Sequence, residues 1–200
     1  MVAIARRLSP DTAPAVARAL ADGGVGAVEI TLNDPVEHAL ATVRAVARAA
    51  DGFEVGAGTV LSIEAAQGAI DAGATFLVMP HTDERLIEWA AGRGIATLPG
   101  AATPTEALAA WRAGAAAIKV FPASVLGPPF IRELRGPFPD LPMVPTGGVT
   151  AGSTSAFIEA GAIAVGVGSW LLGDGDPEGV TARARRVTQA VAAAREGSTT

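Results

Sequence analysis

Lys119 and Glu29 are the two side chains of this sequence with the clearest potential for chemistry. Lys119 interrupts an apolar run over residues 116–122, and it is the one lysine among the 15 lysine and arginine residues. Glu29 interrupts a second apolar run over residues 28–32. A charge in an apolar strand is costly unless it is paired or neutralised, and lysine, unlike arginine, can lose its proton there. We therefore predict that Lys119 is an amine nucleophile that forms a Schiff base.

Glu29 is the predicted partner of this amine. Strand alternation places Ala27 and Glu29 on one face, and Ala117 and Lys119 on one face, so both polar groups can point into one pocket lined by small residues. A structural alternative is a buried ion pair that only holds the fold together. Such pairs often stabilise less than apolar side chains would. We favour catalysis, in which burial frees the amine to attack a ketone and the carboxylate moves protons.

Two glycine-rich segments predict an anion site. Thr146 precedes Gly147 and Gly148, and Gly168 precedes Ser169. Glycines let backbone N–H groups approach a phosphate at the start of a helix. The alternative is that these glycines only form the turns that complete the fold. The pattern Gly56-Ala57-Gly58 lacks the third glycine of a dinucleotide fingerprint, so no nucleotide cofactor is expected.

Composition excludes several other functions. The chain has no cysteine and two histidines, which excludes thiol nucleophiles and disfavours a zinc or iron site, so no metal and no cofactor are expected. The net charge is −5 and no basic cluster exceeds two residues, so nucleic acid is not an expected partner. No apolar stretch is long enough to span a bilayer. We expect no membrane contact and a cytoplasmic location, with which the absence of cysteine agrees.

The chain alternates short apolar runs with segments typical of helices. The predicted strands cover residues 2–6, 27–30, 54–57, 75–78, 95–98, 116–120, 142–144 and 163–167. The predicted helices cover residues 9–22, 34–50, 62–73, 83–93, 103–114, 128–134, 152–160 and 177–196. Three Ala-Gly-Ala junctions, at 72–74, 113–115 and 160–162, each precede a strand and are typical of helix ends that need a left-handed residue.

Eight strands that each precede a helix indicate an α/β fold with a parallel sheet. We predict a single-domain (β/α)8 TIM barrel over residues 1–196, in preference to a doubly wound sheet, with a frayed tail at 197–200. The active sites of such barrels lie at the carboxyl ends of the strands. The polar residues that interrupt or follow the predicted strands mostly lie there, with Arg6 at the end of the first strand and Lys119 on the sixth.

These residues belong to motifs that closely resemble those of a known family. The motifs are Val28–Leu32, Gly56–Val60, Pro80–His81, Leu98–Gly100, Ile118–Pro122, Gly136–Pro139, Val144–Val149 and Val165–Ser169. They resemble 2-keto-3-deoxy-6-phosphogluconate (KDPG) aldolase, the class I aldolase also called 4-hydroxy-2-oxoglutarate aldolase. The resemblance spans nearly the whole chain in order. It implies a (β/α)8 barrel, commonly a homotrimer, that cleaves KDPG to pyruvate and glyceraldehyde 3-phosphate, and it leaves open whether the enzyme serves sugar-acid breakdown or 4-hydroxy-2-oxoglutarate.

The resemblance also implies a role for each motif residue. Lys119 would form the Schiff base, and Glu29 would be the acid and base, acting partly through water. Thr59 would bind the carboxylate of the pyruvyl half, and Pro80 and Phe121 would line its pocket. The region that holds the phosphate and the aldehyde half would comprise Thr146, Gly147, Gly148, Gly168 and Ser169.

One position departs from the family pattern. Many members carry an arginine four residues after the glutamate, where this chain has Asn33. Other members carry an arginine at the end of the first strand, which Arg6 matches, so Arg6 is expected to hold the substrate carboxylate. The segment 32–35 resembles the aldolase of the C4 epimer, 2-keto-3-deoxy-6-phosphogalactonate, whereas Thr146 resembles the gluconate enzyme. Either epimer stays open, and so does a non-catalytic sugar-phosphate-binding barrel.

Overall fold

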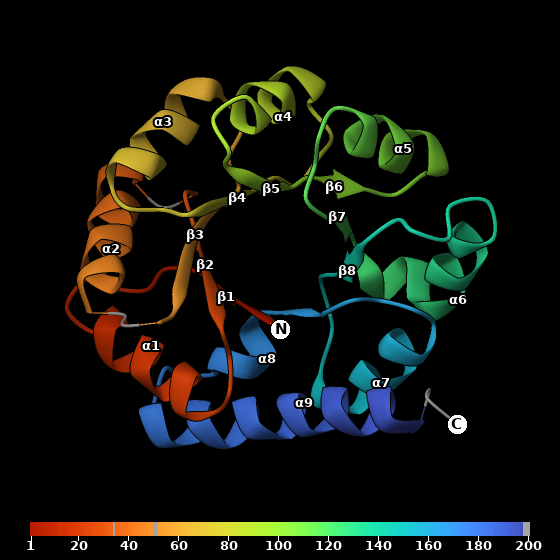
Figure 1. Cartoon of the computed structure of the whole chain (residues 1–200). Helices are drawn as coiled ribbons and strands as arrows, with labels where there is room; N and C mark the ends of the chain where they lie inside the picture. Colours follow the sequence, from red (N-terminus) through yellow and green to blue (C-terminus); the bar gives the residue numbers. More distant parts are fainter. Residues whose placement is uncertain (34, 50–51, 198–200) are drawn as a thin grey trace.

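The computed structural model describes residues 1–33, 35–49 and 52–197. Strands and helices alternate along this part of the chain (Figure 1). The strands are β1 (Val2–Ala5), β2 (Ala27–Thr31), β3 (Glu54–Gly58), β4 (Phe76–Val78), β5 (Ala96–Leu98), β6 (Gly100–Ala101), β7 (Ile118–Val120), β8 (Met143–Pro145) and β9 (Gly166–Val167). The helices are α1 (Ala13–Asp22), α2 (Val36–Ala49), α3 (Ile63–Asp71), α4 (Glu84–Ala91), α5 (Pro104–Arg112), α6 (Ala123–Arg135), α7 (Ala151–Glu159), α8 (Ser169–Leu172) and α9 (Pro177–Gly197).

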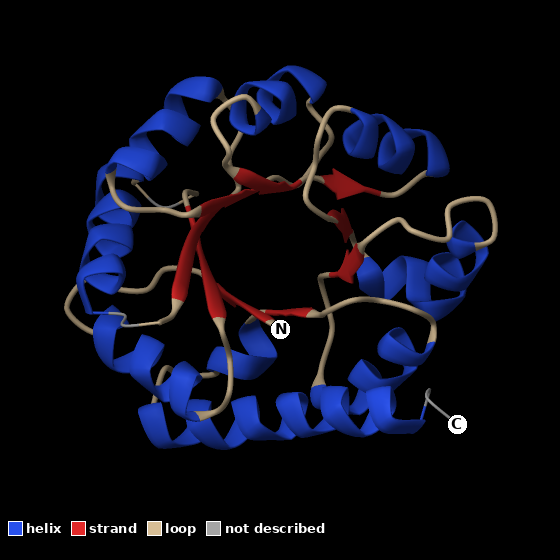
Figure 2. Cartoon of the chain, in the orientation of Figure 1, coloured by secondary structure: helices blue, strands red, loops and turns tan. Residues whose placement is uncertain are grey.

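All the paired strands run parallel and form two curled sheets. One sheet has the order β5-β4-β3-β2-β1-β9, and the other has the order β6-β7-β8. Only Pro99 separates β5 from β6, and Thr146, directly after β8, forms a parallel bridge with Gly166 of β9. Figure 2 shows the strands around a common centre with the helices outside them. The chain therefore folds as an α/β protein with a curled parallel sheet.

The helices begin and end where the side chains favour it. Thr103 and Glu106 form a capping box at the start of α5, and Ser62 and Asp83 accept backbone N–H groups at the starts of α3 and α4. The glycines of the three Ala-Gly-Ala junctions, at positions 73, 114 and 161, have φ values of 103°, 101° and 105°. Glycine adopts this conformation without the strain that a Cβ would bring. The tight turns return the chain to the next strand.

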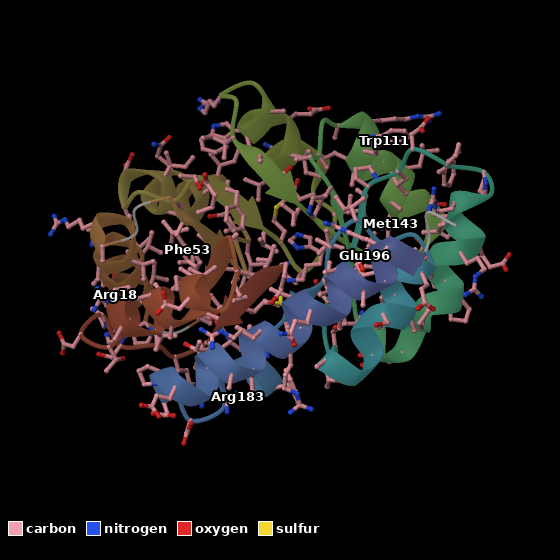
Figure 3. All side chains as sticks on the ribbon, turned by 60° about the horizontal axis from the view of Figure 1, so that its bottom comes forward. Arg18, Phe53, Trp111, Met143, Arg183 and Glu196 are labelled. Atoms are coloured by element: carbon pink, nitrogen blue, oxygen red, sulfur yellow. The ribbon has the colours of Figure 1, made fainter. Side chains whose placement is uncertain are left out.

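The long helix α9 supports one edge of the candidate site. It packs across α1 and α7, and Figure 3 shows Arg183 near one end and Glu196 near the other. Arg183 donates Nε to the carbonyl oxygen of Leu171, at 2.7 Å, and a terminal nitrogen to that of Leu172, at 2.9 Å. These bonds tie α9 to the end of α8, whose first residue is Ser169.

The structure differs from the sequence prediction at several elements. The strand β6 and the short helix α8 were not predicted, and β9 has two residues rather than the predicted 163–167. The predicted helix 128–134 begins earlier, at Ala123, because Gly127 (φ 67°) joins two helical segments across a kink. The helix α9 extends to Gly197, and residues 198–200 lie outside the described part of the chain, as do Asp34 and Ala50 at the ends of the second predicted helix.

Candidate active site

Lys119 and Glu29 lie close together although they belong to different sheets. Glu29 on β2 is paired with Gly56 of β3, and Lys119 on β7 is paired with Gly100 of β6. Both side chains point to the centre around which the strands are arranged. The Nζ atom of Lys119 lies 3.8 Å from Oε1 of Glu29, and the two residues are 7% and 2% exposed. The two groups that the sequence singled out thus form a buried pair.

Burial dominates the electrostatics of this pair. It lowers the pKa of Lys119 and raises the pKa of Glu29, because each charged form loses its water. The attraction between the two groups opposes both pKa changes without cancelling them, and the charge of Arg6 lowers the pKa of both. The neutral amine that a Schiff-base nucleophile needs is therefore more accessible here than for a lysine in water.

The amine of Lys119 also faces an aromatic ring. Its Nζ atom lies 5.3 Å from the centroid of the Phe121 ring. Phe121 and Pro80 are half-buried residues at the carboxyl ends of β7 and β4. Thr59 follows β3 with φ at 57°, which is unusual for a β-branched residue and is typical of functional positions. The three residues expected to surround the pyruvyl half thus all follow strand ends.

A cavity of about 170 Å³ lies at the same ends of the strands. Five residues that the sequence analysis named line it: Arg6, Gly147, Gly148, Gly168 and Ser169. Its remaining lining residues are Ile4, Val149, Thr150 and Trp170.

The backbone around this cavity suits an anion. Gly147 and Gly148 have φ values of 94° and 77°, so the chain turns sharply there before Thr150 caps the N-terminus of α7. A helix N-terminus with nearby free N–H groups and a cation such as Arg6 favours negative charge. The cavity therefore has the features that a phosphate site requires.

Thr146 is the one predicted phosphate-region residue that does not line this cavity. It is 4% exposed, and its hydroxyl donates to the carbonyl oxygen of Val144 at 3.2 Å. It lies against Gly166, whose missing side chain leaves it room. Thr146 thus lies against β9, outside the lining of the cavity.

Sequence reasoning missed some residues of the cavity wall. Trp170 was not among the predicted site residues, yet it lines the cavity, and its ring lies 5.8 Å from the guanidinium of Arg186. Thr150 lacked the full capping-box signal in the sequence, because its partner is Ser153 rather than the usual glutamate or glutamine. Their proximity to Gly168-Ser169 and Gly147-Gly148 was the only available signal.

Two other kinds of site are absent from the part of the chain that the structure describes. No helix there is both long and apolar enough to cross a bilayer. No cluster of three or more His, Cys, Asp or Glu side chains that could hold a metal ion is found among those residues.

Comparison with known proteins adds the family. The family model described as KDPG and KHG aldolase matches residues 1–181. The chain belongs to this family. A relative from Rhizobium meliloti (strain 1021), named probable 2-dehydro-3-deoxy-6-phosphogalactonate aldolase, is 40% identical over 176 residues, which cover 88% of this chain and 82% of that protein. Family members are named aldolases, so this chain is a carbon–carbon lyase.

Solved structures agree with the family assignment. A structure described as native KDPGal matches with a TM-score of 0.91 and 36% identity, and covers 98% of this chain and 95% of that chain. KDPG aldolase from Legionella pneumophila matches with a TM-score of 0.83 and 26% identity, and covers 93% and 92%. That structure holds pyruvate captured at low pH as a covalent carbinolamine intermediate. The curled α/β fold described above is thus the fold of this family.

Proposed function

We propose that this chain is a class I aldolase that cleaves KDPG to pyruvate and D-glyceraldehyde 3-phosphate, and that it also accepts 4-hydroxy-2-oxoglutarate. The observation that carries the proposal is the buried pair of Lys119 and Glu29, with Nζ and Oε1 3.8 Å apart. An amine of lowered pKa beside a carboxylate of raised pKa suits a reaction that needs a nucleophile and a proton carrier.

The reaction begins at the ketone carbon C2. Neutral Lys119 attacks C2, a proton supplied by Glu29 or by water lets the C2 oxygen leave as water, and a protonated imine forms beside the carboxylate of Glu29. Glu29, directly or through water, takes the proton of the C4 hydroxyl as the C3–C4 bond breaks. The electron pair of that bond moves to C3 and is delocalised into the imine, and C4 leaves as an aldehyde. Glu29 then returns a proton to C3, and water hydrolyses the imine to release pyruvate and restore the amine. No metal or cofactor is part of this scheme.

The order of groups on the substrate fits the order of groups around the site. The C1 carboxylate is bonded to C2, so it must lie beside Lys119, near Thr59, Pro80 and Phe121. The phosphate is four carbons beyond C2, which directs it toward the cavity of Arg6 and the paired glycines. We therefore assign the carboxylate to Arg6 and Thr59, and we assign the phosphate and the aldehyde half to Thr146, Gly147, Gly148, Gly168 and Ser169.

The alternative substrate is the C4 epimer, 2-keto-3-deoxy-6-phosphogalactonate. The relative from Rhizobium meliloti carries that name, and the segment 32–35 resembles that enzyme. We expect a higher kcat/KM for KDPG, because Thr146 has the identity that resembles the gluconate enzyme. The measurement is kcat/KM for each pure epimer, with pyruvate release coupled to lactate dehydrogenase. Faster cleavage of the galactonate epimer would transfer the assignment to the alternative, whereas no cleavage of either would reject both.

The Arg6→Gln substitution tests how the substrate is held. Arg6 lies close enough to the pair for its charge to lower the pKa of both Glu29 and Lys119, and the C1 carboxylate must bind beside them. We expect the substitution to raise the pyruvate concentration for half-maximal imine trapping by about 10- to 100-fold, the effect of losing one charged hydrogen-bonding group. If pyruvate trapping is unchanged and only KM for the phosphorylated substrate rises, Arg6 serves the phosphate instead.

Three further features of the protein are part of this proposal. Counting β5, Pro99 and β6 as one strand, the strands would close into an eight-stranded (β/α)8 barrel that forms one domain over residues 1–196. The bridge between Thr146 and Gly166 supports closure of the barrel between β8 and β9.

The homotrimer implied by the family resemblance is tested by light scattering, and the cytoplasmic location stays a prediction from composition. A non-catalytic barrel is set aside, because the chain belongs to a family of lyases.

A further inference from the structure

Gly58 lies directly against the side chain of Glu29. It is the last residue of β3 and is paired in register with Thr31, two residues beyond Glu29 on the neighbouring strand. The side chain of Glu29 leans along its strand toward the carboxyl end, as side chains in strands commonly do. A Cβ built on Gly58 would overlap the Oε1, Cδ and Cγ atoms of Glu29. The carboxylate therefore occupies the volume that any other residue at position 58 would fill.

Space, rather than backbone conformation, is what requires glycine at this position. The φ of Gly58 lies outside the positive range, and the residue is part of a regular strand. Its carbonyl oxygen accepts the backbone N–H of Leu32 at 2.8 Å, as any residue could do there. An alanine could adopt this backbone without strain, so a substitution at Gly58 changes the volume beside Glu29 and little else.

The same arrangement recurs at two other glycines of the strands. A Cβ on Gly56 would overlap the ring of Phe76, and a Cβ on Gly166 would overlap the hydroxyl of Thr146. In each case the space beside a glycine is occupied by a side chain from the neighbouring strand. What distinguishes Gly58 is that its neighbour is the predicted proton carrier.

Packing contributes to the position of this carboxylate, because the amine of Lys119 is, within the described part of the chain, a single and distant hydrogen-bonding partner. Among the residues that the structure describes, no backbone amide or hydroxyl donates to Glu29, and its charged contact is the amine of Lys119 at 3.8 Å. A glutamate has three rotatable side-chain bonds and would otherwise adopt several rotamers. The carboxylate that lies 3.8 Å from Lys119 occupies space that is free because Gly58 has no side chain.

We propose that Gly58 is a positioning residue for Glu29, and that the absence of its side chain fixes the carboxylate within reach of Lys119 and of the substrate C4 hydroxyl. The inference rests on the proposed function, since it assigns Gly58 to the proton-transfer step. It gives the second glycine of the Gly56–Val60 motif a chemical purpose separate from turn formation or phosphate binding.

Gly58→Ala tests this inference. Because the atoms that an alanine would meet are the end of a flexible side chain, we expect the variant to fold and to displace the carboxylate of Glu29. The kcat for KDPG cleavage should fall about 100-fold, the effect of a misplacement of about 1 Å. Trapping of the pyruvate imine by borohydride should persist, and its pH midpoint should move to lower pH, because the carboxylate that raises the pKa of Lys119 has moved away.

Two comparisons separate positioning from a general loss of structure. Gly26→Ala adds the same methyl group just before β2, where nothing lies within 4 Å, and should leave kcat and the pH midpoint unchanged. In Glu29→Ala the atoms that a methyl on residue 58 would meet are absent. The double variant Glu29→Ala/Gly58→Ala should therefore have the same kcat as Glu29→Ala alone.

Each outcome of this cycle is decisive. If the Glu29→Ala variant has a low kcat while the Gly58→Ala variant keeps the wild-type kcat and pH midpoint, the inference is overturned and the proposed function is not. The inference is also overturned if Gly58→Ala lowers kcat by the same factor in the Glu29→Ala background as in the wild type. A fully active Glu29→Ala instead overturns the proposed role of Glu29. If Gly58→Ala does not fold, a folded double variant supports the inference, and an unfolded one overturns it.

Discussion

Lys119→Met is expected to abolish both cleavage of KDPG and covalent trapping of pyruvate. Methionine nearly matches the length of the lysine side chain and suits the apolar strand β7, but it has no amine to attack C2. The kcat should fall by about 10⁴-fold or more, as for loss of a catalytic nucleophile. The measurements are the cleavage rate and the intact mass after incubation with pyruvate and borohydride, which adds a reduced pyruvyl group to the wild-type chain.

The composition of the chain leaves few other amines that could react with pyruvate in this test. Lys119 is the only lysine, so the other primary amine is that of Met1. Burial lowers the pKa of that amine as well, which makes it a possible background nucleophile. Peptide mapping separates the two positions. An adduct that survives at full yield in Lys119→Met would reject Lys119 as the nucleophile, whereas a trace at Met1 in both proteins would not.

The meeting of Lys119 and Glu29 could be predicted because it depends on features that the sequence states directly. Polar residues that interrupt apolar strands are rare, and alternation fixes which face they occupy. In a fold of parallel strands around one centre, two inward residues on β2 and β7 have few places to point. The helix starts at Ser62 and Thr103 were equally visible, because capping is a local interaction.

Other features depended on long-range packing and could not be predicted. The short β6 has no local signal of its own, whereas the kink at Gly127 is local, because Pro128 and Pro129 directly follow that glycine. The motif around Gly58 was visible, but its contact with Glu29 depends on the register between β2 and β3, which no pattern in either segment specifies. A one-residue change of register would place that glycine elsewhere.

The two groups of the pair also constrain each other electrostatically. Burial pushes the lysine toward its neutral amine and the glutamate toward its neutral acid, while their mutual attraction favours both charged forms. Transfer of one proton from Lys119 to Glu29 makes both groups neutral, which removes the desolvation cost of both charges. The pair therefore titrates as a unit, and a change to one partner must appear in the pH dependence of the other.

Glu29→Gln is expected to separate imine formation from carbon–carbon bond cleavage. Glutamine has nearly the same shape as glutamate, so it fits the space beside Gly58, but it cannot take the proton of the C4 hydroxyl. The kcat for KDPG should fall by about 10²- to 10⁴-fold, the usual contribution of a general acid or base. Pyruvate trapping on Lys119 should persist, because the nucleophile is intact.

The pH dependence of trapping in this variant has a definite sign. In the wild type, burial lowers the pKa of Lys119 and the carboxylate of Glu29 raises it by a smaller amount. Removing the carboxylate leaves burial unopposed by that charge, so the pKa of Lys119 falls further and its amine is free at lower pH. The midpoint of the trapping rate against pH should therefore move toward acid in Glu29→Gln.

Glu54→Gln is the matched control for this shift. Glu54 begins the neighbouring strand β3, at the end away from the site, where its carboxylate accepts the hydroxyl of Thr75. The same loss of one negative charge at that position should leave both kcat and the trapping midpoint at their wild-type values. An equal acid shift in both variants would trace the effect to overall charge. In Glu29→Gln, a shift of the trapping midpoint toward alkali would show that this carboxylate does not stabilise the ammonium of Lys119. An unchanged kcat would show that it does not carry the C4 proton.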